Sequence, residues 1–120
     1  GGPASVYDKA APLAPGWIYE RDIPILGICY GMQVLTHQMG GKVMPGTKRE
    51  YGHAVLHKNT NRNPIFTNLP PALPVWMSHG DQIAEAPSGF SVLAHTDNSR
   101  AFARQDCRVT SRIAPDNIAK

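Results

Sequence analysis

A short apolar run that leads directly into a predicted helix restricts the possible folds of this chain more than any other segment. Residues 23–29 read Ile-Pro-Ile-Leu-Gly-Ile-Cys and are almost wholly apolar. A run of this kind is typical of a strand buried on both faces, as in a parallel sheet covered by helices. Pro24 is compatible only with the first residues of such a strand. The sequence therefore predicts an α/β fold with an open, mostly parallel sheet and flanking helices.

A helix is predicted immediately after this run, over residues 30–39. Its apolar face is formed by residues spaced i, i+3, i+4 and i+7, namely Met32, Leu35, Thr36 and Met39. Gly40-Gly41 supplies a left-handed stop. A short helix is predicted at residues 17–20 and a helical turn at 64–66. Strands are predicted at residues 42–44, 53–57, 75–78 and 90–94, the third of them ending at His79-Gly80-Asp81.

The composition is that of an ordinary globular protein. The chain has 120 residues, which suits one domain or part of one, and its 42 % apolar and 18 % charged residues argue against disorder. The net charge of +3 lies entirely in residues 100–120, so the body has no basic patch for nucleic acid. No run approaches the ~20 residues that span a bilayer, and no signal segment opens the chain. We therefore expect a cytoplasmic protein without a membrane or nucleic-acid partner.

Cys29 is the most informative residue, because it stands where the apolar run meets the helix. Glycine lies two places before it and two after it, at Gly27 and Gly31, which lets the chain turn sharply and keeps bulk away from the thiol. This is the pattern of a nucleophile elbow with cysteine in place of serine. Unpaired N–H groups at the helix start favour a thiolate, and the Tyr30 N–H would point at an oxyanion. The alternative is that Cys29 is a small buried hydrophobic residue.

Four segments in order resemble class I glutamine amidotransferases. Residues 27–33 resemble the nucleophile motif of the family, and Gly1-Gly2-Pro3 resembles the end of an upstream loop that provides a backbone oxyanion donor. Residues 49–52 and 75–81 are similar to segments of one member. The resemblance covers residues 1–99, where it implies a partial amidotransferase domain with a flavodoxin-like sheet truncated at both ends.

The resemblance also implies a reaction and a set of roles. Cys29 would attack the side-chain amide of glutamine and form a thioester, while Gly2 and Tyr30 would donate the oxyanion N–H groups. Gln33 would contact the glutamine. The α-amino and α-carboxylate groups would be held at a strand end by Ser78, His79, Gly80 and Asp81. Alternatives are that His79 is the general base and that Asp81 is only a turn residue.

The resemblance places the general base in a His-Pro-Glu motif, which these 120 residues do not contain. We therefore expect this chain alone to be inactive. The most similar member passes ammonia to a synthetase domain that uses ATP and Mg to aminate xanthosine monophosphate, and the complete enzyme is expected to be a homodimer. No P-loop glycine string occurs, so we expect neither cofactor nor metal in this chain. The alternatives are another class I amidotransferase with a different acceptor, a non-catalytic remnant of the fold, and an unrelated cysteine hydrolase.

Two further segments are open to more than one interpretation. Arg49 and Glu50 are either a surface ion pair of small energetic value or part of an interface with the partner domain. Residues 100–120 do not match the family. Their arginines recur every fourth residue, which would line one face of a helix for an acidic partner: Arg100, Arg104, Arg108 and Arg112. The abrupt loss of similarity favours instead an out-of-frame or divergent end, with Cys107 incidental. A sheet without its outer strands is expected to expose its edges and apolar faces, so we expect the isolated chain to fold poorly or to aggregate.

Overall fold

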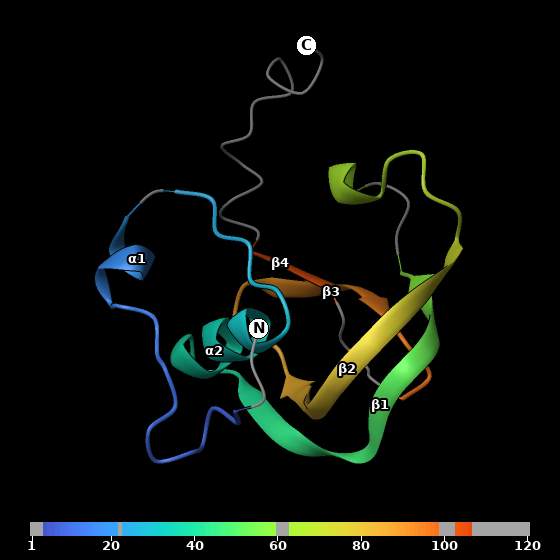
Figure 1. Ribbon diagram of the computed structural model, residues 1–120. Helices are drawn as coiled ribbons and strands as arrows, with labels where there is room; N and C mark the ends of the chain where they lie inside the picture. The colour runs from blue at the N-terminus through green and yellow to red at the C-terminus, as the bar shows by residue number, and fades with distance from the viewer. Residues whose placement is uncertain (1–3, 22, 60–62, 99–102, 107–120) are drawn as a thin grey trace.

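The computed structural model describes residues 4–21, 23–59, 63–98 and 103–106. Within them, two α-helices, one 3-10 turn and four strands follow one another along the chain (Figure 1). Their order is α1 (Trp17–Glu20), α2 (Tyr30–Gln38), β1 (Lys42–Lys58), η1 (Pro64–Phe66), β2 (Ala72–Glu85), β3 (Phe90–His95) and β4 (Ala103–Asp106).

The helices and β3 confirm the sequence predictions to within a residue at each end, as does η1. The other strands are longer than predicted. The strands expected at residues 42–44 and 53–57 are two parts of β1, and the strand expected at 75–78 lies inside β2. The prediction that this strand ends at His79-Gly80-Asp81 is wrong, because β2 continues through these residues to Glu85.

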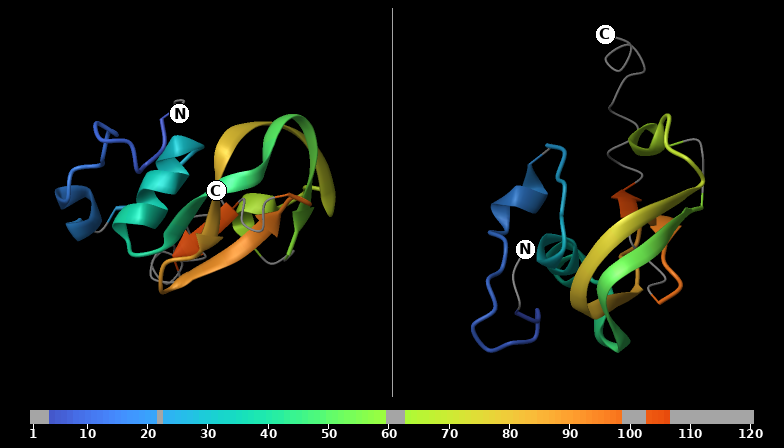
Figure 2. Two further views of the ribbon diagram at one scale, coloured as in Figure 1. Left: turned by 90° about the horizontal axis from the view of Figure 1, so that it is seen from below. Right: turned by 45° about the vertical axis from the view of Figure 1, so that its right-hand side comes forward.

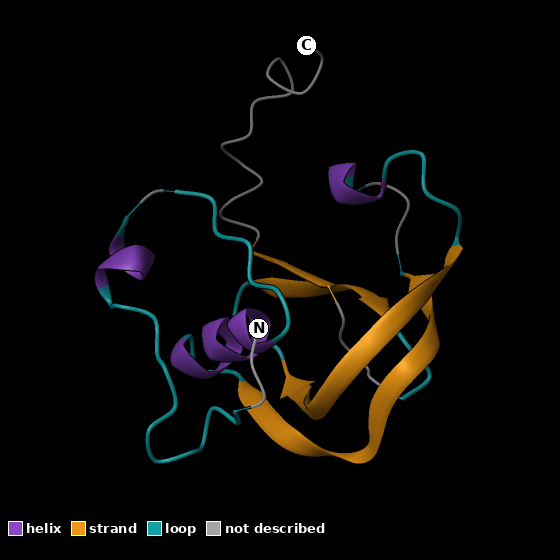
Figure 3. Ribbon diagram, in the orientation of Figure 1, coloured by secondary structure: helices purple, strands orange, loops and turns teal. Residues whose placement is uncertain are grey.

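The strands form one sheet with the spatial order β2-β1-β3-β4, drawn in orange in Figure 3. All three neighbouring pairs are antiparallel. The α/β class is confirmed, but the mostly parallel sheet is not found among the described residues. Parallel neighbours need a long crossover, usually a helix, and no α-helix lies between β1 and β3. The strands also alternate in burial, since Trp76 is 70 % exposed and Met77 only 5 %, which is typical of antiparallel strands with one face in water.

The prediction of a strand at residues 23–29 is also wrong. Residues 23–28 form no strand, and their larger apolar side chains are exposed: Ile23, Ile25, Leu26 and Ile28. A strand buried on both faces needs hydrogen-bonding neighbours along its edges. None of the four described strands pairs with this segment, so its apolar side chains stay in contact with water.

Helix α2 lies between the N-terminal segment and the sheet, as the two views of Figure 2 show. Its buried face joins a first core cluster, which consists of Val6, Val34, Val43 and Ile83. The helix ends in a Schellman motif: Gly40 has φ 87°, and the Gly41 N–H donates to the Thr36 carbonyl at 2.8 Å. The predicted left-handed stop is therefore confirmed at Gly40.

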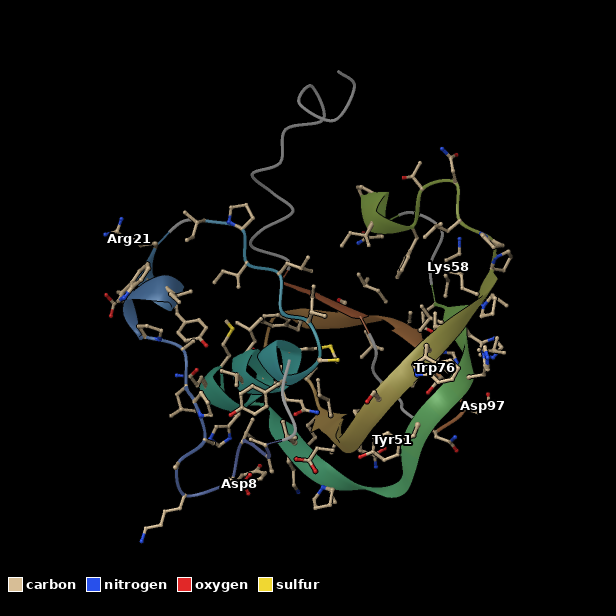
Figure 4. The ribbon with its side chains drawn as sticks, viewed as in Figure 1. Asp8, Arg21, Tyr51, Lys58, Trp76 and Asp97 are labelled. Atoms are coloured by element: carbon tan, nitrogen blue, oxygen red, sulfur yellow. The ribbon has the colours of Figure 1, made fainter. Side chains whose placement is uncertain are left out.

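A second core cluster lies at the other end of the β1–β2 ribbon. It consists of Leu56, Phe66, Leu93 and Ala94, with Leu73 and Val75 packed against it. The buried Phe66 of η1 and the buried residues of β3 thus close the inner face of the ribbon. The opposite face of the ribbon carries exposed aromatic side chains, Tyr51 and Trp76, which are labelled in Figure 4.

Part of the C-terminal region is described. Residues 103–106 form β4, which pairs with β3, so the helical interpretation of the arginine repeat is wrong there. Arg100, Arg108, Arg112 and Cys107 lie outside the described residues. No helix in the described ranges is long and apolar enough to cross a membrane.

Candidate active site

Cys29 adopts the backbone conformation of a nucleophile elbow. Its φ is 52° and its ψ is −118°, a region that residues with a side chain rarely occupy. It is the N-cap of α2, and its carbonyl accepts from the Met32 and Gln33 N–H groups at 3.0 and 3.3 Å. Holding a non-glycine residue there costs about 1–3 kcal/mol and is characteristic of functional sites. The side chain is exposed, so the alternative of a buried hydrophobic cysteine is wrong.

The two glycines that flank Cys29 have different roles. A Cβ on Gly27 would lie 2.5 Å from Leu35 Cδ1 and 2.9 Å from the carbonyl carbon and oxygen of Gly31. Only glycine therefore lets the chain before the elbow approach the helix after it. A Cβ on Gly31 would meet nothing within 4 Å. The prediction that both glycines are needed for a sharp turn holds sterically for Gly27 alone.

Tyr30 opens α2, so its backbone N–H belongs to the group that a helix leaves without an intrahelical acceptor. This places the donor next to Cys29, as an oxyanion role requires. The Tyr30 hydroxyl donates to the Pro12 carbonyl at 2.9 Å and fastens the N-terminal segment to the helix start. Gly2, the other predicted oxyanion donor, lies outside the described residues, as do the side chains of Arg49 and Glu50.

The predicted substrate residues of α2 and β2 meet at one atom, the carbonyl oxygen of Asp81. Gln33 Nε2 donates to it at 3.2 Å, and His79 Nδ1 lies 2.8 Å from it. Gln33 is 7 % exposed, whereas Ser78 is exposed and residues 79–81 are half-buried. Gln33 follows Cys29 by four residues, so it lies about one turn into the helix that Cys29 caps. The structure thus brings Gln33 and residues 79–81 together, and Cys29 lies at the start of the helix that carries Gln33.

The β1–β2 ladder is interrupted at this place. Pro45 pairs with Asp81, and Glu50 pairs with His79, so residues 46–49 of β1 lie opposite Gly80 alone. Bulges of this kind re-aim side chains next to active sites. The Tyr51 hydroxyl lies 3.8 Å from where a Cβ on Gly80 would stand. Sequence reasoning missed both the bulge and the place of Tyr51, although Tyr51 belongs to the segment 49–52 that carried part of the resemblance.

An open apolar hollow of 280 Å³ lies beside the elbow and contains none of the predicted site residues. It is lined by Gly31, Val34 and Leu35 of α2, by residues 25–27 and by the N-terminal residues Pro12, Leu13, Ala14 and Ile18. It follows from the exposure of Ile25 and Leu26, and its lining includes no polar side chain that would orient a substrate. In the described residues, no three His, Cys, Asp or Glu side chains gather as metal ligands would.

Comparisons with known proteins agree with this arrangement. The family described as Glutamine amidotransferase class-I matches residues 1–108. A GMP synthase [glutamine-hydrolyzing] of Dehalococcoides mccartyi is 55 % identical over 98 residues, which are 82 % of this chain and 18 % of the relative. That of Aquifex aeolicus is 54 % identical over 99 residues, 82 % of this chain and 19 % of the relative. This chain therefore spans about a fifth of these curated relatives.

Solved structures show the same likeness. A protein of Thermoplasma acidophilum described as one component of a GMP synthase has a TM-score of 0.70 at 27 % identity, covering 76 % of this chain and 45 % of its own. A glutamine amidotransferase of Thermotoga maritima has a TM-score of 0.63 at 30 % identity, covering 69 % and 36 %. The family match ends at residue 108, beyond the predicted boundary at residue 99, and the nature of residues 100–120 stays a prediction. The chain belongs to the class I glutamine amidotransferase family.

Proposed function

We propose that this chain is the glutamine-hydrolysing part of a GMP synthase. The observation that carries the proposal is the elbow: an exposed cysteine with φ 52° at the start of α2, the helix whose Gln33 contacts Asp81 of β2. The identity of 54–55 % to curated GMP synthases supports the choice of this member within the family.

The reaction that fits this geometry is hydrolysis of a side-chain amide. The Cys29 thiolate attacks the amide carbon of glutamine, and the carbonyl electrons move to oxygen, where the Tyr30 N–H donates a hydrogen bond. The C–N bond then breaks, and ammonia leaves with a proton from the histidine of a His-Pro-Glu motif, which these 120 residues do not contain, so this chain alone is not expected to complete the reaction. Water cleaves the resulting thioester, which releases glutamate and restores the thiol. Gly2 is the second proposed oxyanion donor.

Glutamine is the proposed substrate, and Gln33, Ser78, His79, Gly80 and Asp81 are the proposed binding residues. Ser78 is exposed at the start of this segment, and the bulge opposite Gly80 interrupts the ladder there. Where the ladder is interrupted, backbone N–H and C=O groups lack their regular partners in the neighbouring strand. Such groups can bind the α-carboxylate and α-amino groups of an amino acid.

The ammonia is proposed to pass to an ATP-dependent synthetase domain of the same enzyme, which aminates xanthosine monophosphate. The described residues do not fit a Mg–ATP site, since they hold no cluster of metal-ligating side chains and the sequence has no P-loop glycine string. We therefore derive no step through ATP or Mg in this chain. A homodimeric, cytoplasmic enzyme completes the proposal.

A segment exchange tests the proposal. The aligned residues of this chain replace the matching segment of the Dehalococcoides mccartyi GMP synthase, and the chimera is expressed in a bacterium that lacks its own enzyme. We expect growth without guanine on glutamine as nitrogen donor. Cys29→Ser should abolish this growth and leave growth at high ammonium intact, because ammonium bypasses glutamine hydrolysis.

Two results would contradict the proposal. Growth of the Cys29→Ser chimera equal to that of its parent without added ammonium would remove Cys29 from the chemistry. A chimera that grows only at high ammonium, while its Cys29 still reacts with a glutamine-mimicking electrophile, would favour an amidotransferase with a different acceptor.

A further inference from the structure

The carbonyl oxygen of Asp81 joins the elbow helix to β2. It accepts from Gln33 Nε2 at 3.2 Å and lies 2.8 Å from His79 Nδ1. A carbonyl oxygen has two lone pairs, so these two donors occupy its full accepting capacity. The Gln33 donor comes from α2 and ties the helix to β2, whereas the His79 donor lies two residues earlier in β2 itself and fixes the local conformation of that strand.

Gln33 is placed for this contact by the helix itself. It lies one turn after Cys29, and its side chain is 7 % exposed. A buried amide must be hydrogen-bonded, and an unpaired one costs about 1–3 kcal/mol. The bond to Asp81 satisfies one of the two donors of the amide nitrogen by a contact within the protein.

The contact also defines the state of His79. A carbonyl oxygen can only accept, so His79 Nδ1 must carry the hydrogen in this bond. A ring nitrogen that already donates to a carbonyl cannot take up a proton. His79 Nδ1 is therefore not a general base, and its role in this place is to hold the backbone two residues further on.

The ladder does not hold this part of β2 on its own. Residues 46–49 of β1 lie opposite Gly80, so the regular pairing stops at His79 and resumes at Asp81. Backbone that leaves a ladder needs other partners to stay in one position. The two side-chain bonds to the Asp81 carbonyl supply them at the point where the ladder is interrupted.

We propose that Gln33 and His79 are positioning residues that act through their shared acceptor, the Asp81 carbonyl: Gln33 holds residues 79–81 against α2, and His79 fixes the conformation within that segment. The inference rests on the proposed function, because residues 79–81 are the proposed glutamine-binding segment. Loss of either donor releases the segment, so glutamine binds more weakly while the exposed thiol of Cys29 keeps its reactivity toward small, neutral reagents.

The test measures how fast Cys29 is alkylated by the diazoketone analogue of glutamine over a range of analogue concentrations. Gln33→Met and His79→Phe remove one donor each at similar volume. We expect each to raise the half-saturating analogue concentration on the order of tenfold. The double variant should show about the same shift as either single variant, because both act on one segment. The rate with iodoacetamide should stay within about twofold.

Two control variants distinguish this loss of analogue affinity from a general loss of stability. Gln38 lies on the same helix and makes three hydrogen bonds to Ala14 and Tyr19 through its amide. Gln38→Met therefore removes more bonds than Gln33→Met but none at Asp81, and it should not shift the half-saturating concentration. His79→Asn keeps an N–H near the position of Nδ1 and should restore most of the affinity. A Gln38→Met shift equal to that of Gln33→Met, or no rescue by His79→Asn, would overturn the inference.

Additive effects would also overturn it: a shift of roughly a hundredfold in the double variant would mean that the two side chains act independently and not through one segment. Amide hydrogen exchange separates the inference from the proposed function. Gln33→Met should speed exchange of residues 79–82 by about tenfold, whether or not the analogue binds. Unchanged exchange would refute the positioning role, whereas faster exchange without selective labelling of Cys29 in the unmodified chain would refute only the proposed function.

Discussion

The helix that follows Cys29 and the segment that precedes it both carry apolar side chains, and only the helix buries them. In α2, Val34 is 5 % exposed and belongs to the first core cluster, whereas Leu26 in residues 23–28 is 79 % exposed. A helix satisfies its own backbone groups and needs one covering face. A buried strand also needs partners along its edges. Apolar composition alone therefore does not bury a segment; the available neighbours decide.

At Gly27 the segment before Cys29 packs closely against helix α2, which follows it. A side chain at this position should therefore lower the stability of the chain more than the other substitutions described below. Because a Cβ would lie within 2.9 Å of the Gly31 carbonyl group, Gly27→Val should lower the free energy of unfolding by about 3 kcal/mol. Urea unfolding of dilute protein followed by tryptophan fluorescence measures this. Gly31→Ala, which meets nothing within 4 Å, should be neutral or stabilising. Equal effects of the two variants would show that the segment before Cys29 does not pack against α2.

Truncating one apolar side chain in α2 and one in residues 23–28 compares the burial of the two segments directly. Val34→Ala should cost about 2 kcal/mol, because it opens a cavity in the first core cluster. Leu26→Ala should change the free energy of unfolding by less than about 0.5 kcal/mol, since the side chain is already in water. The same urea experiment reports both values. A cost at Leu26 as large as that at Val34 would restore the buried strand that the sequence predicted.

The end of the helix gives a smaller effect. Gly40 has φ 87°, which a residue with a side chain adopts at a cost of about 1 kcal/mol. Gly40→Ala should destabilise the chain by that amount, measured as the shift in the urea midpoint at constant slope. Gly16→Ala is the control, because Gly16 has φ −55° and nothing within 4 Å of its Cβ position. A neutral Gly40→Ala would contradict the Schellman end.

Tyr19 gives the smallest effect, one that depends on pH. Its hydroxyl donates to Gln38 Oε1 at 2.9 Å, and burial raises the pKa of Tyr19 above its ordinary value of 10.0. The folded state therefore holds the proton more tightly than the unfolded state. Stability from this group is fully present below pH 10 and is lost as pH rises through the folded-state pKa. Tyr19→Phe should make the urea midpoint less dependent on pH in that range; an identical alkaline decline in both proteins would exclude Tyr19 as its source.

The sequence predicted those features that depend on neighbours along the chain. The spacing from Met32 to Met39 gave the helix, Gly40 gave its end, and the glycines around Cys29 gave the elbow. Features that depend on distant segments were missed. The antiparallel register, the bulge opposite Gly80 and the bonds to the Asp81 carbonyl join β1, β2 and α2, and no local pattern in any one of these elements encodes them.

The resemblance to the family gave most of the candidate site. It named Cys29, Gln33 and residues 78–81 together, although α2 and β2 are separated by more than 30 residues of sequence, and the structure places Gln33 in contact with Asp81. The resemblance could not predict which hydrogen-bond partner each of these side chains has within the protein. The resemblance assigned Gln33 to the substrate, which stays a prediction, and it gave no indication that the amide nitrogen donates to the strand.

The elbow at Cys29 is best tested by intact-mass measurement of alkylation by the diazoketone analogue of glutamine, with peptide mapping to separate Cys29 from Cys107. We expect one adduct per chain, located at Cys29, with glutamine slowing its formation and glutamate or asparagine slowing it far less. Equal modification of Cys29 and Cys107, or a rate that glutamine does not change, would contradict the assignment of Cys29 as the nucleophile of a glutamine site.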